Sequence, residues 1–242
     1  MSVFVISDLH LSIGEDKPMD IFGPAWGNYT TLIEQNWKSL VSEDDTVIIP
    51  GDISWAMSTE EAHTDLEFVN SLPGRKILMK GNHEYWWNTK SKLNALQRKH
   101  GLDTLYFFHN DGFYLEGGGF LMAGTRGWMV PDDKNFKKET DASIYRREAI
   151  RLEASIKKAK EDACKKGVEG APLVVFLHYP PFSPAGGRNT FWDILDKYNV
   201  SKVYYGHLHG ASCGTKKPAE MSFPTECVSA DHLRFVPVKL GI

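Results

Sequence analysis

The sequence has few cysteines, no long hydrophobic run and no excess of basic residues. Its three cysteines, Cys164, Cys213 and Cys227, form no Cys-X-X-Cys pair, which argues against a structural zinc site of that kind. An odd number of cysteines in a chain of this length suggests a reducing compartment. No apolar stretch is long enough to span a bilayer, and the first residues resemble no signal peptide. We therefore expect a cytoplasmic protein with no membrane partner.

The charge balance is slightly acidic, since 28 Lys and Arg residues face 31 Asp and Glu residues, for a formal net charge of −3. Proteins that bind nucleic acid without sequence preference usually carry a basic surface, so the sequence gives no strong nucleic-acid signal. The composition, 42% hydrophobic and 24% charged, is typical of a soluble globular protein. We expect one domain over residues 1–242, and the sequence carries no signal for a particular oligomeric state.

The first half of the chain alternates between apolar runs and helical patterns. The runs at residues 3–6, 46–49 and 76–79 are short and continuous, which is typical of strands buried on both faces. A helical pattern follows each run, at residues 30–40, 58–71 and 85–99. Repeated strand–helix units predict a parallel sheet with right-handed crossovers.

The second half begins with closely spaced strands at residues 105–108, 113–115 and 120–123, separated by glycine-rich turns. The longest helix is expected at residues 141–166, with an apolar stripe through Ile144, Ile150, Leu152 and Ile156. Further strands are expected at residues 173–177 and 202–205, and a terminal hairpin at residues 225–238. The fold class is therefore α/β, with two packed mixed sheets and helices outside them.

Polar residues follow five of the predicted strands directly. In α/β sheets, ligand sites collect at the carboxyl ends of the strands. Leaving Glu84 aside, these residues provide two carboxylates, one amide and five imidazoles. The stretches are Asp8-Leu9-His10, Gly51-Asp52, Gly81-Asn82-His83-Glu84, His178 and Gly206-His207-Leu208-His209.

This set of side chains can hold two divalent metal ions and leave one histidine for acid–base work. Nitrogen and oxygen ligands without thiolate suit Mn, Fe, Zn, Co or Ni, and Mn²⁺ is our first choice in vitro. Two ions roughly 3.5–4 Å apart clamp the attacking and leaving oxygens of a phosphoryl centre, and water between them becomes the nucleophile. A histidine outside the metal shell can then protonate the leaving alkoxide.

The ordered set of motifs resembles the calcineurin-like metallophosphoesterase superfamily, and the resemblance spans Asp8 to His209. It implies a four-layer αββα sandwich and the hydrolysis of a phosphomonoester or phosphodiester by a metal-bridging hydroxide. It further implies that Asp8, His10 and His209 hold one ion, that Asn82, His178 and His207 hold the second, that Asp52 bridges both, and that His83 contacts phosphate and assists the leaving group.

The sequence departs from one branch of the superfamily. Phosphoprotein phosphatases usually extend the second motif to Asp-Arg-Gly, whereas this chain continues from Asp52 to Ile53. We therefore favour a small-molecule or nucleotide-like phosphoester substrate. The alternatives are a phosphoprotein phosphatase and a metal-binding scaffold of the same fold without turnover.

Two residues outside the motifs are candidates for substrate binding. Arg126 follows a predicted strand and can reach a phosphate as a bidentate donor, although it can also be an ordinary surface arginine. Trp55 lies three residues after Asp52 and can wall an apolar or base-stacking pocket, although tryptophans are more often core residues.

Overall fold

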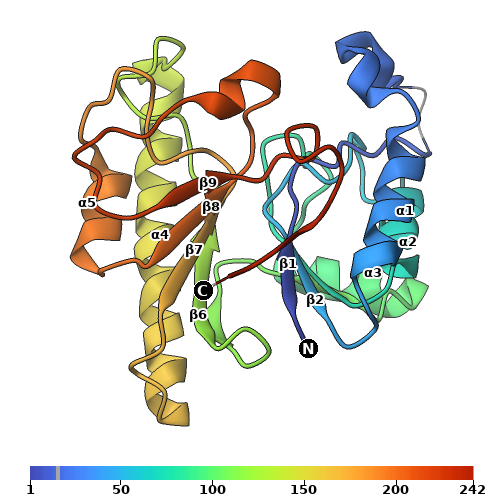
Figure 1. Cartoon of the computed structure of the whole chain (residues 1–242), viewed down its shortest axis with the longest axis horizontal. Helices are drawn as coiled ribbons and strands as arrows, with labels where there is room; N and C mark the ends of the chain where they lie inside the picture. The colour runs from blue at the N-terminus through green and yellow to red at the C-terminus, as the bar shows by residue number, and fades with distance from the viewer. Residues whose placement is uncertain (15–16, 242) are drawn as a thin grey trace. The chain divides into compact units, whose positions relative to one another are not determined.

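The structure, a computed structural model, describes residues 1–14 and 17–241. The described chain divides into two compact units (Figure 1). The first unit comprises Met1–His109 and Val228–Gly241, and the second comprises Asn110–Cys227. Within the described residues, each unit contains one five-stranded sheet. The single domain over residues 1–242 stays a prediction.

The sheet of the first unit is mixed. Its strand order is β10-β1-β2-β3-β4, with β1 to β4 parallel and β10 antiparallel to β1. Nearly every position of β1 to β3 is buried, as their continuous apolar runs predict. The strands are β1 (Val3–Val5), β2 (Thr46–Ile49), β3 (Arg75–Leu78), β4 (Leu105–Phe107) and β10 (Val238–Lys239).

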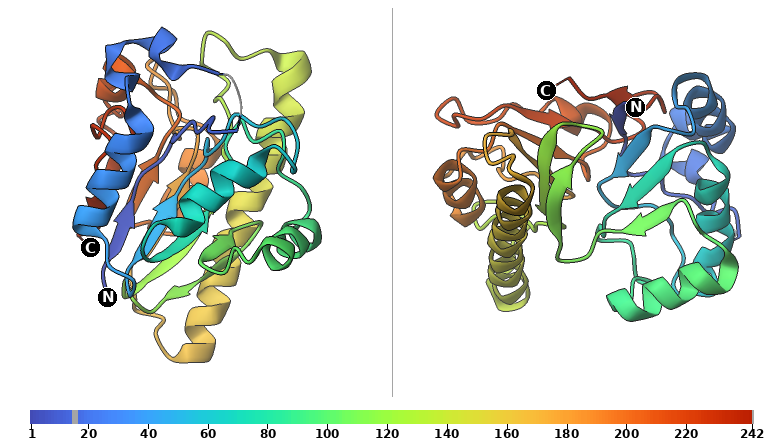
Figure 2. Two further views of the ribbon diagram at one scale, coloured as in Figure 1. Left: turned by 90° about the vertical axis from the view of Figure 1, so that its right-hand side faces the viewer. Right: turned by 90° about the horizontal axis from the view of Figure 1, so that it is seen from below.

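Three helices cover one face of this sheet (Figures 1 and 2). They are α1 (Tyr29–Leu40), α2 (Ala62–Ser71) and α3 (Lys90–His100), and two 3-10 helices, η1 (Met19–Phe22) and η2 (Pro24–Trp26), precede α1. The expected start of α3 at residue 85 is wrong, because Thr89 caps the helix by accepting a hydrogen bond from Lys92 N. Trp86 and Trp87, which come before this cap, are buried in the core.

The sheet of the second unit is also mixed. Its order is β5-β6-β7-β8-β9, with β5 antiparallel to β6 and the other neighbours parallel. Figure 1 shows α4 and α5 on the same face of this sheet. The elements are β5 (Gly112–Leu115), β6 (Phe120–Thr125), α4 (Lys138–Lys166), β7 (Leu173–Leu177), α5 (Thr190–Lys197), β8 (Lys202–Tyr205), η3 (Gly210–Gly214) and β9 (Thr225–Cys227).

The long helix α4 is confirmed, but part of its predicted apolar stripe is wrong. Ile150 is 70% exposed, whereas Leu152 and Ile156 are fully buried. Tyr145 and Ala149 belong to the buried stripe instead. The large hydrophobic side chain at position 150 suggested burial, but its position on the helix faces it away from the sheet.

The predicted hairpin over residues 225–238 is also wrong. β9 pairs with β8 in the second unit, whereas β10 pairs with β1 in the first, with Val238 opposite Val5. The two segments therefore belong to different sheets. A turn-like segment around Ala230 and Asp231 cannot reveal this, because the pairing partners lie far away in the sequence.

The α/β fold class, with two mixed sheets and flanking helices, is confirmed. Among the described residues, no helix combines the length and the apolar character needed to cross a membrane. In both sheets, parallel strands carry the predicted motif residues just beyond their carboxyl ends.

Candidate metal centre

The first two motifs run side by side in the first unit. Asp8 N donates to Gly51 O at 3.0 Å, and His10 N donates to Asp52 O at 3.0 Å. These bonds continue the parallel pairing of β1 and β2 beyond the strands themselves. The two motifs therefore meet at one edge of the sheet, as their positions after neighbouring strands predict.

Three of these motif residues have left-handed backbone conformations. The φ angles are 58° at Asp8, 46° at His10 and 50° at Asp52. Positive φ is uncommon for residues other than glycine, and such strain collects at functional sites when the surrounding structure enforces it. The regular alternation of a strand therefore does not govern where the Asp8 and His10 side chains point.

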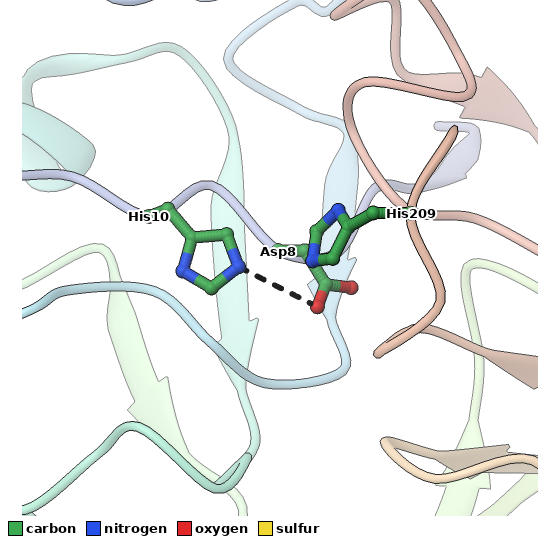
Figure 3. A group of neighbouring side chains, drawn as sticks. All are labelled: Asp8, His10 and His209. Carbon is green, nitrogen blue, oxygen red and sulfur yellow. Dashed lines mark ion pairs between the residues drawn. The ribbon is translucent and has the colours of Figure 1, made fainter. Parts of the chain in front are cut away.

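The donor atoms of the first unit lie close enough to share an ion. His10 Nε2 lies 3.9 Å from Asp8 Oδ1, the pair joined by the dashed line in Figure 3. The same nitrogen lies 3.9 Å from Asp52 Oδ2. Two ligand atoms that each lie roughly 2.0–2.2 Å from one ion can be at most about 4.4 Å apart. These buried imidazole and carboxylate groups therefore fit a divalent transition metal.

Further hydrogen bonds orient these ligands. Ser229 Oγ donates to Asp8 Oδ2 at 3.1 Å, and Tyr29 OH donates to His10 O at 2.8 Å. Partners of this kind fix the orientation of metal ligands and are a regular part of metal sites. Ser229 comes from the segment before β10, far from Asp8 in the sequence, so no motif predicts its role.

The third motif places His83 against Asp52. His83 N donates to Asp52 Oδ1 at 2.9 Å, and His83 Nε2 lies 3.9 Å from Asp52 Oδ2. The His83 side chain is 29% exposed, so it can meet a ligand from solvent. Asn82, the residue before it, is half-buried. Asp52 therefore adjoins both the His10 side chain and the expected phosphate-contacting histidine.

Trp55 lies against the same two imidazoles. Its ring stacks on His10 with centroids 4.9 Å apart, and it lies 4.1 Å from the ring of His83. Trp55 is half-buried and packs against the core of the first unit. Trp55 therefore agrees with both predictions made for it from the sequence, because it packs against the core and stays partly exposed.

Glu84 has a structural role beside the predicted ligands that the motifs alone did not predict. It is 1% exposed, and its carboxylate accepts hydrogen bonds from three backbone N–H groups. The Asp52 N–H donates at 3.1 Å, and the N–H groups of Ile53 and Gly81 donate as well. Glu84 therefore ties the second motif to the third. Only its place at the end of the third motif pointed to it.

Gly81 allows this close approach between the two motifs. A Cβ atom at this position would lie 2.2 Å from Asp52 Oδ1 and 2.5 Å from Asp52 N. No side chain fits in that space without moving the Asp52 backbone. The glycine that precedes Asn82 is therefore required by packing against the expected bridging ligand.

The second unit holds the remaining predicted histidines. His178 follows β7 and is fully buried, and His207 follows β8 in a left-handed conformation with φ of 68°. Their ring centroids are 5.2 Å apart, and the backbone links them because Gly206 N donates to His178 O at 3.1 Å. His209, also drawn in Figure 3, is the residue before η3. The second unit thus contributes imidazoles and no carboxylate ligand from the predicted set.

Arg126 lies beside His178 in the second unit. Its carbonyl oxygen accepts hydrogen bonds from His178 N at 3.1 Å and from Tyr179 N at 2.9 Å. The Arg126 side chain is 14% exposed and lies 3.6 Å from the Glu148 carboxylate. Burial lowers the pKa of Arg126, while Glu148 opposes this effect. Arg126 is therefore not an ordinary exposed surface arginine.

Comparison with known protein families identifies the family of this chain. The calcineurin-like phosphoesterase family matches residues 1–211. The protein belongs to this family, and its two helix-flanked mixed sheets agree with the family's sandwich fold. Family membership and the candidate ligand groups together support a metal-dependent phosphoesterase.

The individual proteins that resemble this chain share limited sequence identity with it. The chain is 39% identical over 80 residues to the "Gene 66 protein" of Mycobacterium phage L5, a match that covers 32% of this chain and 37% of the phage protein. A protein of unknown function from Aquifex aeolicus has a similar structure, with a TM-score of 0.53 and 15% identity, over 98% of this chain and 95% of that one. Phosphopantetheinyl hydrolase from Mycobacterium tuberculosis gives a TM-score of 0.49 and 17% identity, over 86% and 83% of the two chains. The Aquifex likeness supports the fold.

Proposed function

We propose that the protein is a dinuclear metallophosphoesterase that hydrolyses a small-molecule or nucleotide-like phosphomonoester or phosphodiester. The observation that carries this proposal is the position of Asp52. Its carboxylate lies 3.9 Å from both His10 Nε2 and His83 Nε2, and it accepts the backbone N–H of His83. One side chain thus adjoins both the proposed metal ligand His10 and the histidine proposed to contact phosphate.

Two divalent ions, with Mn²⁺ as the first choice, would supply an activated water and neutralise charge on the phosphoryl oxygens. In this proposal Asp52 belongs to both ligand sets. One ion would be held by Asp8, His10 and His209 with Asp52, and the other by Asn82, His178 and His207 with Asp52.

The remaining residues have proposed roles in binding the substrate and moving a proton. His83 contacts the phosphoryl group and donates a proton to the leaving oxygen, which fits its partly exposed position. Trp55 offers an aromatic surface beside His83 for the leaving group. Arg126 offers a guanidinium group to a substrate anion.

One observation makes the phosphoprotein phosphatase alternative less suitable. The residues that follow Asp52 are Ile53 and Ser54, and both are fully buried. The Ser54 hydroxyl donates to the Asp65 carboxylate, so this segment is directed into the core of the first unit. The position at which phosphoprotein phosphatases carry a phosphate-binding arginine therefore presents no cation.

The test is hydrolysis of a chromogenic aryl phosphodiester and of the matching monoester by the manganese-loaded protein. His83→Ala should lower kcat by roughly 10²–10⁴-fold, the usual contribution of general acid catalysis, without loss of bound metal. His232→Ala is the matched control, because His232 is exposed and lies outside the motifs.

The substrate pattern then refines the proposal. Turnover of the diester would indicate a phosphodiesterase, and turnover of the monoester alone would indicate a phosphatase. If the protein binds two manganese ions but hydrolyses neither ester, the enzyme proposal fails and the scaffold alternative takes its place. Full activity of His83→Ala would contradict the proposed role of that residue.

A further inference from the structure

A group of three arginines surrounds one buried carboxylate in the second unit. Glu148 on α4 is 1% exposed and accepts a hydrogen bond from the Thr125 hydroxyl. Arg151 Nη1 lies 2.7 Å from Glu148 Oε1, Arg126 Nη2 lies 3.6 Å from it, and Arg147 Nε lies 3.7 Å from it. Three cations around one anion leave this group of residues with a surplus of positive charge.

The carboxylate is shared unequally among these arginines. Arg151 makes a hydrogen bond to Glu148, whereas the 3.6 Å separation of Arg126 from the same oxygen is longer than a hydrogen bond. In the described structure, the buried Nε of Arg126 has no hydrogen-bond partner. A buried donor without a partner is unfavourable, so an oxyanion that accepts from Arg126 would satisfy a group that the fold leaves unsatisfied.

The position of the Arg126 side chain is well defined by packing. Its guanidinium lies 4.4 Å from the ring centroid of Trp128, a cation–π arrangement. Trp128 is itself held, since its Nε1–H donates to Asp141 Oδ1 at 3.2 Å. A guanidinium stacked on a fixed ring loses little conformational freedom when it binds a ligand.

The backbone places this arginine next to the candidate metal centre. β6 and β7 are parallel neighbours, with Thr125 opposite Leu177, and both His178 N and Tyr179 N donate to Arg126 O. Arg126 and His178 therefore leave the same edge of the same sheet from adjacent strands.

We propose that Arg126 determines substrate specificity by binding a second anionic group, distinct from the phosphoryl group that is hydrolysed. The inference rests on the proposed function, in which the two metal ions and His83 already neutralise the reacting phosphoryl group. The substrate class is then a compact phosphoester with two anionic groups, such as a nucleoside bisphosphate. Arg126 matches a phosphate or carboxylate because its fork of N–H donors fits two oxygens at once.

The experiment compares two binding probes that differ by one phosphate, adenosine 5′-monophosphate and adenosine 3′,5′-bisphosphate. Calorimetric titrations use manganese-loaded protein in the His83→Ala background, so that neither probe is turned over. The bisphosphate should bind about tenfold more tightly, the effect of one charge-assisted hydrogen bond. Adding Arg126→Met should remove this preference, whereas the affinity for the monophosphate should change less than threefold.

Two further variants separate binding from structure. Arg146→Met is the matched control, because Arg146 is an exposed arginine on α4, the helix that carries Glu148, and its Nε–H donates to Ala142 O. This change should keep the preference for the bisphosphate. Arg126→Lys keeps the charge but loses the fork, and it should retain only part of the preference. Thermal unfolding of each variant shows whether the fold is intact.

Three results would overturn the inference. These are equal affinities of the His83→Ala protein for the two probes, an equal loss of both affinities in Arg126→Met, and the same loss of preference in Arg146→Met. Failure of the proposed function is a separate result, because it is seen as absent hydrolysis of aryl phosphoesters by the protein with His83 intact. A preference for the bisphosphate without such hydrolysis would support the anion site at Arg126 and contradict the proposed enzyme activity. Hydrolysis without the preference would support the enzyme activity and contradict the anion site.

Discussion

The carboxyl edges of the two sheets carry different donors and hold them in different ways. The first unit offers the carboxylates of Asp8 and Asp52, and three of its motif residues adopt left-handed backbone conformations. The second unit offers imidazoles from His178, His207 and His209, and of these three only His207 has a positive φ. The negative charge and most of the backbone strain of the candidate centre therefore lie in the first unit.

The contacts that hold the motif residues in place also differ between the two units. In the first unit, the side chains of Ser229 and Glu84 hold Asp8 and the Asp52 loop. In the second unit, backbone hydrogen bonds link the motif segments, from His178 N to Arg126 O and from Gly206 N to His178 O. Single substitutions can remove the side-chain supports of the first unit, but they cannot easily remove the backbone supports of the second.

The largest expected effect is that of Asp52→Asn. The amide keeps the shape of the side chain but removes the charge proposed to face both ions, a loss of several kcal/mol that corresponds to roughly 10³-fold in kcat. His209→Asn in the second unit replaces one neutral ligand by another and should lose less. Turnover of the aryl phosphoester at saturating Mn²⁺ measures both, and equal losses would contradict the contrast between the units.

Glu84→Gln should have the next largest effect. Glutamine has one acceptor oxygen, and its amide nitrogen would face backbone N–H groups that now donate to Glu84. The Asp52 and Gly81 loops should separate, and manganese affinity should fall by roughly 10- to 100-fold, as for other residues that support metal ligands. Metal affinity is measured by titration, without any need for turnover.

The matched control for this change is Glu61→Gln. Glu61 also accepts two backbone N–H bonds, from Met57 at 2.8 Å and from Ser58 at 3.3 Å, but it is exposed and precedes α2. Its substitution should leave manganese affinity unchanged. An unchanged affinity in Glu84→Gln would show that Glu84 stabilises the fold without positioning Asp52.

The smallest effect on the candidate metal centre is expected from two strand lysines, Lys76 and Lys202, which act on the stability of the fold. Burial lowers the pKa of Lys76 on β3 to about 8, where its Nζ donates to the Asn70 and Leu72 carbonyls. For Lys202 on β8, burial also lowers the pKa, but the ion pair with Glu226 at 2.7 Å and contact with Tyr204 raise it overall. The contributions of the two lysines to the free energy of unfolding should therefore change in opposite directions as the pH rises.

The direction of each change follows from the number of protons that the lysine binds in the folded and unfolded states. Between pH 8 and the ordinary lysine pKa, the unfolded state holds more protons at Lys76 than the folded state, so the free energy of unfolding rises with pH in this window. The rise is at most about 3 kcal/mol and should be missing in Lys76→Met. The contribution of Lys202 should be present below its unfolded pKa and lost as the pH rises through the higher folded value. Denaturant titrations at pH 7.5 and 10 measure the rise due to Lys76, and parallel pH profiles for wild type and Lys76→Met would contradict this prediction.

The strands and the donor inventory could be predicted because both depend on local sequence. Continuous apolar runs mark β1, β2, β3, β7 and β8, and the polar residues after them stand at the expected sheet edges. The start of α3 was missed because a single cap at Thr89 decides it. The predicted terminal hairpin is wrong because β10 pairs with β1, and no local sequence pattern encodes a pairing across most of the chain.

The supporting residues were harder to find for the same reason. Glu84, Ser229 and Glu148 act through contacts with residues distant in sequence, and their types are common on any surface. Burial is what gives these polar groups their importance, since a buried carboxylate must find donors. Burial of a single glutamate is visible only after the chain has folded.

The first unit is interrupted in sequence by the whole of the second, since Val228–Gly241 rejoins Met1–His109. During synthesis, β1 leaves the ribosome early but must wait for β10, and Asp8 must wait for Ser229, until the entire second unit has been translated. The part of the protein made first is therefore completed last. A nascent chain stalled before residue 228 would display the Asp8 and Asp52 motifs without the hydroxyl that orients Asp8.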